Sequence, residues 1–170
     1  MTEMPSSPGQ AGASDTRTWS DDTPEELLEQ AQANAQAIVL ATLAFLHSRD
    51  VPLESWAAAV GERLSRAWDE PEPWEAGEFL DAMLTNFRSL GGTVVSANLD
   101  EEEATAVIGG FPDPELCALL GVDPADAARI YDVATPIAAA RGLHWAWSHE
   151  GTQTRVVVRR IAAEESQAQR

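Results

Sequence analysis

Residues 142–161, GLHWAWSHEGTQTRVVVRRI, constrain the fold most because they read as two β-strands joined by a turn at 149–151. Successive side chains of a strand point to opposite faces. The residues on one face of each strand are apolar, namely Leu143, Trp145, Trp147, Val156 and Val158. Such aromatic and β-branched residues suit a pleated, half-buried surface. We therefore predict a hairpin at the centre of a small sheet that the other segments cover.

The first helix is predicted at residues 24–47. Thr23 can cap it, Pro24 suits its first position and Glu26 completes a capping box. Residues at spacings of three and four form a seam suited to another helix, namely Leu28, Ala31, Ala35, Ile38, Thr42 and Phe45. The second half is also apolar on the opposite face, so it is expected either in the core or at a dimer contact. The pattern alone does not decide between these two positions.

Two more helices are predicted before the sheet begins. The first spans about 52–69 and carries one apolar stripe, formed by Leu53, Trp56, Val60, Leu64 and Trp68 or Ala67. Prolines at 71 and 73 end it, because proline lacks an N–H donor and restrains the residue before it. The second spans about 74–90 and turns Leu80, Met83, Leu84, Phe87 and Leu90 inward.

The segment 93–108 is predicted to form another hairpin, with strands at 93–99 and 104–108 around the acidic connection 100–103. A short helix over 101–108 is the alternative. Asp113-Pro114 and Asp123-Pro124 are typical helix starts. The first helix should end at Gly121, and the second should run to about Arg141 with a kink or break at Pro136.

These elements predict an α+β fold in which helices pack on one side of a small, mostly antiparallel four-stranded sheet. We expect a single domain over residues 22–162. Residues 1–21, rich in Pro, Gly, Ser and Thr, are predicted to be a disordered tail, and 163–170 a solvated C-terminal tail.

The formal net charge of −17 limits the classes of partner. Nucleic acids and anionic membranes are bound through Lys and Arg, so neither is expected as a partner. A basic protein partner is compatible with the charge. The N-terminal residues do not form a signal peptide, and no apolar run approaches the ~20 residues that cross a bilayer. The charge is typical of a soluble bacterial protein, and we expect a cytoplasmic location.

Few residues offer catalytic chemistry. Cys117 is the single cysteine and falls in the first turn of a helix, where a thiol pKa can be lowered, or it is a small core side chain. His144 and His149 lack an evident third metal ligand. Arg155 and Arg159 share a strand face and can meet a carboxylate ligand or pair with local Asp and Glu. We therefore assign no catalytic residue and no metal, and the sequence does not identify a cofactor.

Six tryptophans are many for a chain of 170 residues. They either fill the core or line an apolar pocket between the sheet and the helices, with a few polar groups that orient a ligand. The residues assigned to such a ligand site are Trp56, Trp68, Phe87, Cys117, Tyr131, Trp145, Trp147 and Arg155.

Residues 91–161 resemble the small-molecule-binding domains named after 4-vinyl reductase and the L-2-amino-thiazoline-4-carboxylate hydrolase-like proteins. The resemblance lies in the order hairpin, Cys117 near a helix start, helix, Gly142-Leu143 strand entry and Glu150-Gly151 turn. Members with metal-type sites carry a further Cys near the last strand, where this chain has Thr154 to Val158. This departure counts against a metal-dependent or hydrolytic activity. The resemblance implies an apolar-ligand or sensor module that is dimeric through its helices.

Three functions compete on these observations. The first is a non-enzymatic binding or sensory domain for a small apolar ligand, forming a homodimer through helix 24–47. The second is an acidic interaction module, such as a chaperone or immunity-type protein for a basic partner. The third is a hydrolase with Cys117 as nucleophile and His144 or His149 as base, which requires a thiol in a cleft beside a histidine. The first is the function we expect.

Overall fold

A computed structural model describes residues 22–67 and 74–161 of the chain. The tails predicted at 1–21 and 163–170 lie outside the described residues. Within the described ranges, no helix is long and apolar enough to cross a membrane.

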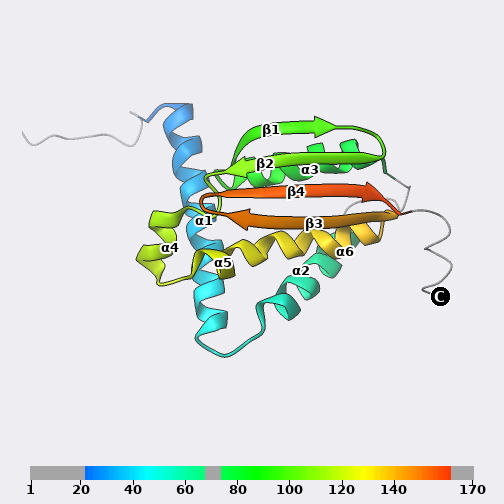
Figure 1. The fold of residues 1–170 in the computed structure, drawn as a ribbon. Coiled ribbons are helices and arrows are strands. Elements are labelled where there is room, and N and C mark those ends of the chain that lie inside the picture. Colours follow the sequence, from blue (N-terminus) through cyan, green and yellow to red (C-terminus); the bar gives the residue numbers. More distant parts are fainter. Residues whose placement is uncertain (1–21, 68–73, 162–170) are drawn as a thin grey trace, which may run out of the picture.

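The four strands in the described part of the chain form one antiparallel sheet in the order β1-β2-β4-β3, so the last of them in the sequence lies inside the sheet (Figure 1). Their bounds are β1 Thr93–Leu99, β2 Glu103–Gly109, β3 Leu143–Glu150 and β4 Gln153–Arg160. Both predicted hairpins are present, and the alternative helix over 101–108 is wrong. Glu150 pairs with Gln153, so the second turn comes slightly later than predicted and His149 belongs to the strand, opposite Thr154.

The helices occupy most of the remaining described chain. Their bounds are α1 Pro24–His47, α2 Leu53–Ala67, α3 Ala76–Ser89, α4 Pro114–Leu120, α5 Pro124–Ala127, the 3-10 helix η1 Ala128–Val133 and α6 Ala134–Ala139. Side-chain caps begin three of them as the sequence predicts: Thr23 accepts from the Glu26 amide, Asp113 from the Leu116 amide and Asp123 from the Ala125 amide. Gly121 ends α4 in the left-handed conformation that favours glycine.

The segment 124–141 differs from the single kinked helix that its sequence predicts. It divides into α5, η1 and α6, and the tighter 3-10 turns of η1 come before Pro136. Pro136 lies in the first turn of α6, where a missing N–H costs no helical hydrogen bond. The break therefore lies earlier in the chain than the proline, because the proline begins a helix instead of interrupting one.

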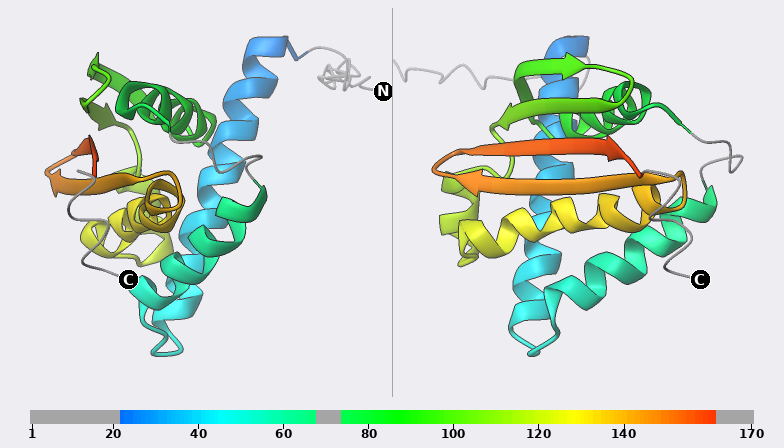
Figure 2. Two further views of the ribbon diagram at one scale, coloured as in Figure 1. Left: turned by 90° about the vertical axis from the view of Figure 1, so that its right-hand side faces the viewer. Right: turned by 45° about the vertical axis from the view of Figure 1, so that its right-hand side comes forward.

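The molecule has three layers, which the end-on view in Figure 2 separates clearly. The sheet is the first layer, and only its inner face is covered by helices. The second layer packs directly on that face, with α3 against β1, β2 and β4 and α6 against β3. The third layer consists of α1 and α2, and α2 packs on η1 and α6. This arrangement confirms the predicted α+β class with helices on one side of the sheet.

The buried apolar side chains form two clusters. The larger lies between the sheet, α3, η1 and α6, and includes Phe79, Leu80, Phe87, Tyr131, Trp145, Val156 and Val158. The smaller lies where α1 meets α2, α4 and α5, and is formed by Leu40, Leu43, Leu53, Cys117, Val122 and Ala127. Gln36 connects α1 to the larger body, because its side chain donates to the Leu90 carbonyl at 2.9 Å and accepts from the Asp113 amide.

Gly61 sets how closely α2 approaches the second layer. A Cβ at this position would overlap the Val133 carbonyl oxygen and the Pro136 ring. Alanine is otherwise better than glycine in a helix interior by about 1 kcal/mol. We predict that Gly61→Ala lowers the free energy of unfolding by about 1–3 kcal/mol in urea denaturation, because close packing outweighs helix propensity.

Gly109→Ala is the matched control for this prediction. Its added Cβ would meet Val95 Cγ2 at 3.5 Å, an ordinary contact. Its stability should therefore stay close to that of the natural chain. A Gly61→Ala protein that is more stable than the natural one would show that α2 does not pack as described.

Candidate ligand-binding site

Four aromatic residues from three elements meet under β3 and β4. Phe87 of α3 lies 4.5 Å from Tyr131 of η1 and 6.3 Å from Trp145 of β3, measured between ring centroids. Trp147 of β3 lies 5.9 Å from Tyr131. Trp145 and Trp147 share the inner face because they pair across the strands with Val158 and Val156. The rings therefore pack against one another and fill the space between sheet and helices.

A chain of polar contacts crosses this aromatic cluster. The Tyr131 hydroxyl donates to the Phe111 carbonyl at 3.0 Å and also contacts the Thr154 hydroxyl. Thr154 Oγ1 lies 2.8 Å from Nδ1 of His149 on the same hairpin. Burial raises the pKa of Tyr131, and the Thr154 hydrogen bond offsets this only in part. The phenol therefore stays protonated at neutral pH and serves as a hydrogen-bond donor inside the core.

An apolar groove of about 310 Å³ opens on the helical side of the molecule, between α2, α3 and the η1–α6 segment. Its lining is Val60, Leu64, Met83, Asn86, Phe87, Ser89, Leu90, Ile130, Val133, Ala134 and Ile137. Among these described residues, only Asn86 and Ser89 bring polar side chains. Phe87 belongs to both the groove and the aromatic cluster, so the groove reaches down to the packed core. Leu64 remains 42% exposed at the groove.

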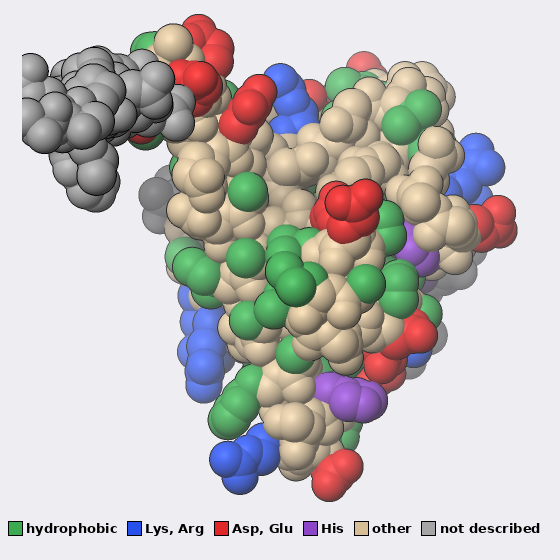
Figure 3. Space-filling model, turned by 90° about the vertical axis from the view of Figure 1, so that its left-hand side faces the viewer, with side chains coloured by type: hydrophobic (Ala, Val, Ile, Leu, Met, Phe, Trp, Pro, Cys, Tyr) green, Lys and Arg blue, Asp and Glu red, His purple; other side chains and the backbone are tan. Residues whose placement is uncertain are grey.

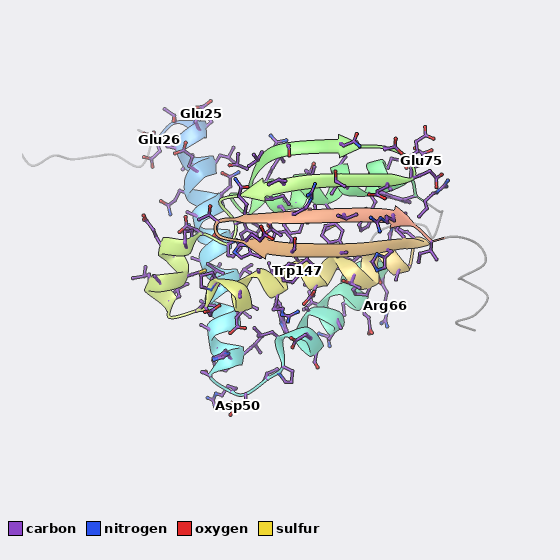
Figure 4. The ribbon with its side chains drawn as sticks, viewed as in Figure 1. Glu25, Glu26, Asp50, Arg66, Glu75 and Trp147 are labelled. Atoms are coloured by element: carbon purple, nitrogen blue, oxygen red, sulfur yellow. The ribbon has the colours of Figure 1, made fainter. Side chains whose placement is uncertain are left out.

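A second cleft, of about 470 Å³, lies along the free edge of β3 beside α5 and η1. Its lining is Ala125, Arg129, Asp132, His144, Trp145, Ala146, Trp147 and His149. Trp147, labelled in Figure 4, donates from Nε1 to Asp132 at 2.7 Å. Arg129 lies 3.3 Å from both Asp132 and Glu54. The Arg129 guanidinium also lies over the Trp147 ring. Arg129, Asp132 and Trp147 of this cleft are thus engaged with one another.

The residues assigned to a ligand site from the sequence do not converge on one pocket. Phe87, Tyr131, Trp145 and Trp147 form the aromatic cluster, and Trp56 packs at the boundary of both core clusters. Arg155 lies on the outer face of the sheet, opposite Ser148 and next to the inward-facing Val156. Trp68 lies outside the described residues. Of the members of the set that the structure describes, Phe87 alone lines the apolar groove.

Cys117 belongs to the smaller core cluster. Its side chain is fully buried against residues of α1 and α2, with Leu116 and Leu120 beside it. Burial raises the pKa of the thiol, and the nearby Asp113 and Asp123 carboxylates raise it further. This environment is the opposite of one that activates a nucleophile. Cys117 thus has the surroundings of a small core side chain, the alternative that the sequence left open.

The charged residues near the strand ends pair locally. Arg159 forms a two-pronged contact with Glu103, at 2.8 and 3.3 Å, and Arg160 lies 3.0 Å from Glu102. These pairs engage Glu102 and Glu103, two of the four residues of the acidic connection after β1. Among residues 22–67 and 74–161, no group of three His, Cys, Asp or Glu side chains is placed to hold a metal ion.

Sequence reasoning missed most of the groove. Val60 and Leu64 were recognised as one stripe of α2, but their exposure to a groove depends on how far α2 stands from α3. Ile130, Val133 and Ile137 come from a segment whose division into η1 and α6 is not evident from its residues. For Arg155 the signal was present, because strand alternation places it on the face opposite Val156.

Comparison of the chain with models of protein families, with curated proteins and with solved structures gives no match. The resemblance to the 4-vinyl-reductase-type domains therefore stays a prediction.

Tyr131 is expected to be a structural donor. We predict that Tyr131→Phe lowers the free energy of unfolding by about 1–3 kcal/mol, because it leaves the buried Phe111 carbonyl without its donor. Urea denaturation followed by circular dichroism measures this loss. Thr154→Val, which removes the neighbouring hydroxyl but keeps the shape, should destabilise as well. An unchanged stability of Tyr131→Phe would exclude the hydrogen bond to Phe111 as a stabilising contact.

Cys117 should be protected from reagents in the folded protein. We predict that iodoacetamide at pH 8 alkylates the folded chain at least about 100-fold more slowly than the urea-unfolded chain, because the thiol is buried and its pKa is raised. Mass spectrometry of timed samples measures both rates. Fast alkylation of the folded protein would restore Cys117 as a candidate nucleophile.

Proposed function

We propose that this protein is a non-enzymatic binding or sensory domain that holds a small apolar molecule in the groove between α2, α3 and the η1–α6 segment. The observation that carries the proposal is the groove itself, which presents nine apolar residues and two neutral polar ones around about 310 Å³. Small-molecule sites typically have volumes of about 300–1,000 Å³ and predominantly apolar linings, so this groove falls at the small end of that range.

The chemistry of the lining defines the ligand class. Among the described residues, none that lines the groove is charged, so a charged ligand would lose its hydration without gaining a partner from them. Asn86 and Ser89 of α3 can orient one neutral polar group. We therefore propose an uncharged, mainly apolar molecule with at most one or two hydrogen-bonding groups.

The position of the groove also supports a sensory role. Its walls come from α3, which packs on the sheet, and from α2, which packs on η1 and α6. A molecule between them would contact both helices and fix their spacing. Binding would then be transmitted to α1, which shares the smaller core cluster with Leu53 of α2.

The first test is native mass spectrometry of the full chain purified from its own host. A bound small apolar molecule that is released on unfolding would support the proposal and identify the ligand. A clean mass of the chain together with a stably bound basic protein would overturn it and favour the acidic interaction module instead.

A second test uses the neutral fluorescent dye N-phenyl-1-naphthylamine. We predict that Leu64→Gln weakens dye binding about tenfold, equivalent to about 1.4 kcal/mol, because it replaces an apolar wall of the groove with an amide. Titration of the dye into each purified protein measures the dissociation constants.

The matched control is Leu119→Gln, the same change at an exposed leucine of α4 outside the groove. It should bind the dye as the natural chain does. Equal weakening by both changes, or by neither, would place the dye elsewhere and count against the groove.

A further inference from the structure

The large apolar side chains of the seam predicted on α1 are left exposed by the described fold. Leu28, Ile38 and Phe45 are 58%, 69% and 57% exposed. Ala31 is exposed too, while Ala35 and Thr42 are half-buried. The side of α1 that packs on the body is a different one, formed by Gln36, Leu40 and Leu43. Within its own chain, α1 therefore packs through a side other than the heptad seam.

Charge restricts what can cover this seam. Residues 30–46 contain no Asp, Glu, Lys or Arg, although the chain as a whole carries a net charge of −17. A basic partner would gain nothing from an uncharged surface, whereas two copies of an acidic chain can approach only where like charges do not face each other. Figure 3 shows hydrophobic side chains gathered across the middle of the face that carries α1 and α4.

We propose that the seam of α1 pairs with the same seam of a second copy, with the two helices antiparallel. In antiparallel coiled coils the two apolar positions of each heptad face one another. In this register each seam residue of one copy lies opposite a seam residue of the other. Leu28 faces Phe45 of the second copy, Ala31 faces Thr42 and Ala35 faces Ile38. The two-fold axis then passes between residues 36 and 37, and alanines let the helices approach closely at the centre.

The charged residues at the two ends of α1 favour the antiparallel direction. Its first turns carry Glu25, Glu26 and Glu29, whereas Arg49 at its other end places its guanidinium 5.3 Å from the centre of the Phe45 ring. Figure 4 shows Glu25 and Glu26 at one end of the helix and Asp50 beyond the other. Antiparallel pairing brings the glutamate-rich end beside Arg49 of the second copy and opposes the helix dipoles. Parallel pairing would bring the glutamates of both copies together.

Sedimentation equilibrium of the full chain tests the pairing. The expected species has twice the 18.3 kDa chain mass. Ile38→Glu should raise the dissociation constant at least about 30-fold, the effect of losing a hot-spot side chain. A natural chain that stays monomeric at every concentration, or an Ile38→Glu protein that dimerises normally, would overturn the proposal.

Two alanine-to-glutamate variants distinguish the loss of a contact at the seam from a general effect of added charge. Ala31→Glu places a carboxylate on the seam, and Ala33→Glu places it on an exposed part of the same helix away from the seam. The first should weaken dimerisation and the second should leave it within about twofold. Added salt should strengthen the dimer, because it screens the repulsion between the two acidic bodies. Equal weakening by both variants would overturn the seam as the contact.

Disulfide trapping tests the direction of the helices. Mixing a Leu28→Cys protein with a Phe45→Cys protein should give a mixed disulfide, while each alone should form little. Cys117 is buried and does not compete. A disulfide within the Leu28→Cys protein alone would show parallel helices and contradict the antiparallel arrangement.

Discussion

Phe87 of α3 and Tyr131 of η1 pack against each other and against the inner face of β3, and this contact holds the layers of the fold together. The sheet buries only one face, so every helix must reach that face or a helix already on it. Phe87 connects α3 to the sheet, and Tyr131 ties η1 to the loop after β2 through the Phe111 carbonyl. The positions of α2 and α1 depend on these contacts because α2 packs on η1 and α1 packs on α2.

Much of the architecture could be predicted because its determinants are local. Thr23, Asp113 and Asp123 cap helices through contacts within three residues, and strand alternation assigns Trp145 and Val156 to a buried face without knowledge of the fold. The segment 124–141 was predicted less well. Its residues are compatible with a continuous helix, and the 3-10 turns of η1 are set by packing against α2 and the sheet.

The candidate site was harder to predict because it is assembled from segments distant in the sequence. The aromatic residues suggested a pocket in the sequence. In the structure Phe87, Tyr131 and Trp145 pack against one another and leave little space between them. The groove arises instead from aliphatic residues of α2, α3 and the η1–α6 segment, whose separation is a property of the tertiary structure. Likewise the heptad spacing of α1 is visible in the sequence, whereas its exposure is not.

The order of the strands has a consequence for how the chain acquires its structure. Of the four strands in the described residues β4 comes last in the sequence, yet it lies between β2 and β3 and supplies Val156 and Val158 to the core. Until it emerges from the ribosome, β2 and β3 have no strand between them, and α3 and α6 have only an incomplete surface to cover. The apolar faces of α3 and α6 are therefore completely covered only once β4 has joined the sheet, so formation of this fold depends on contacts distant in sequence.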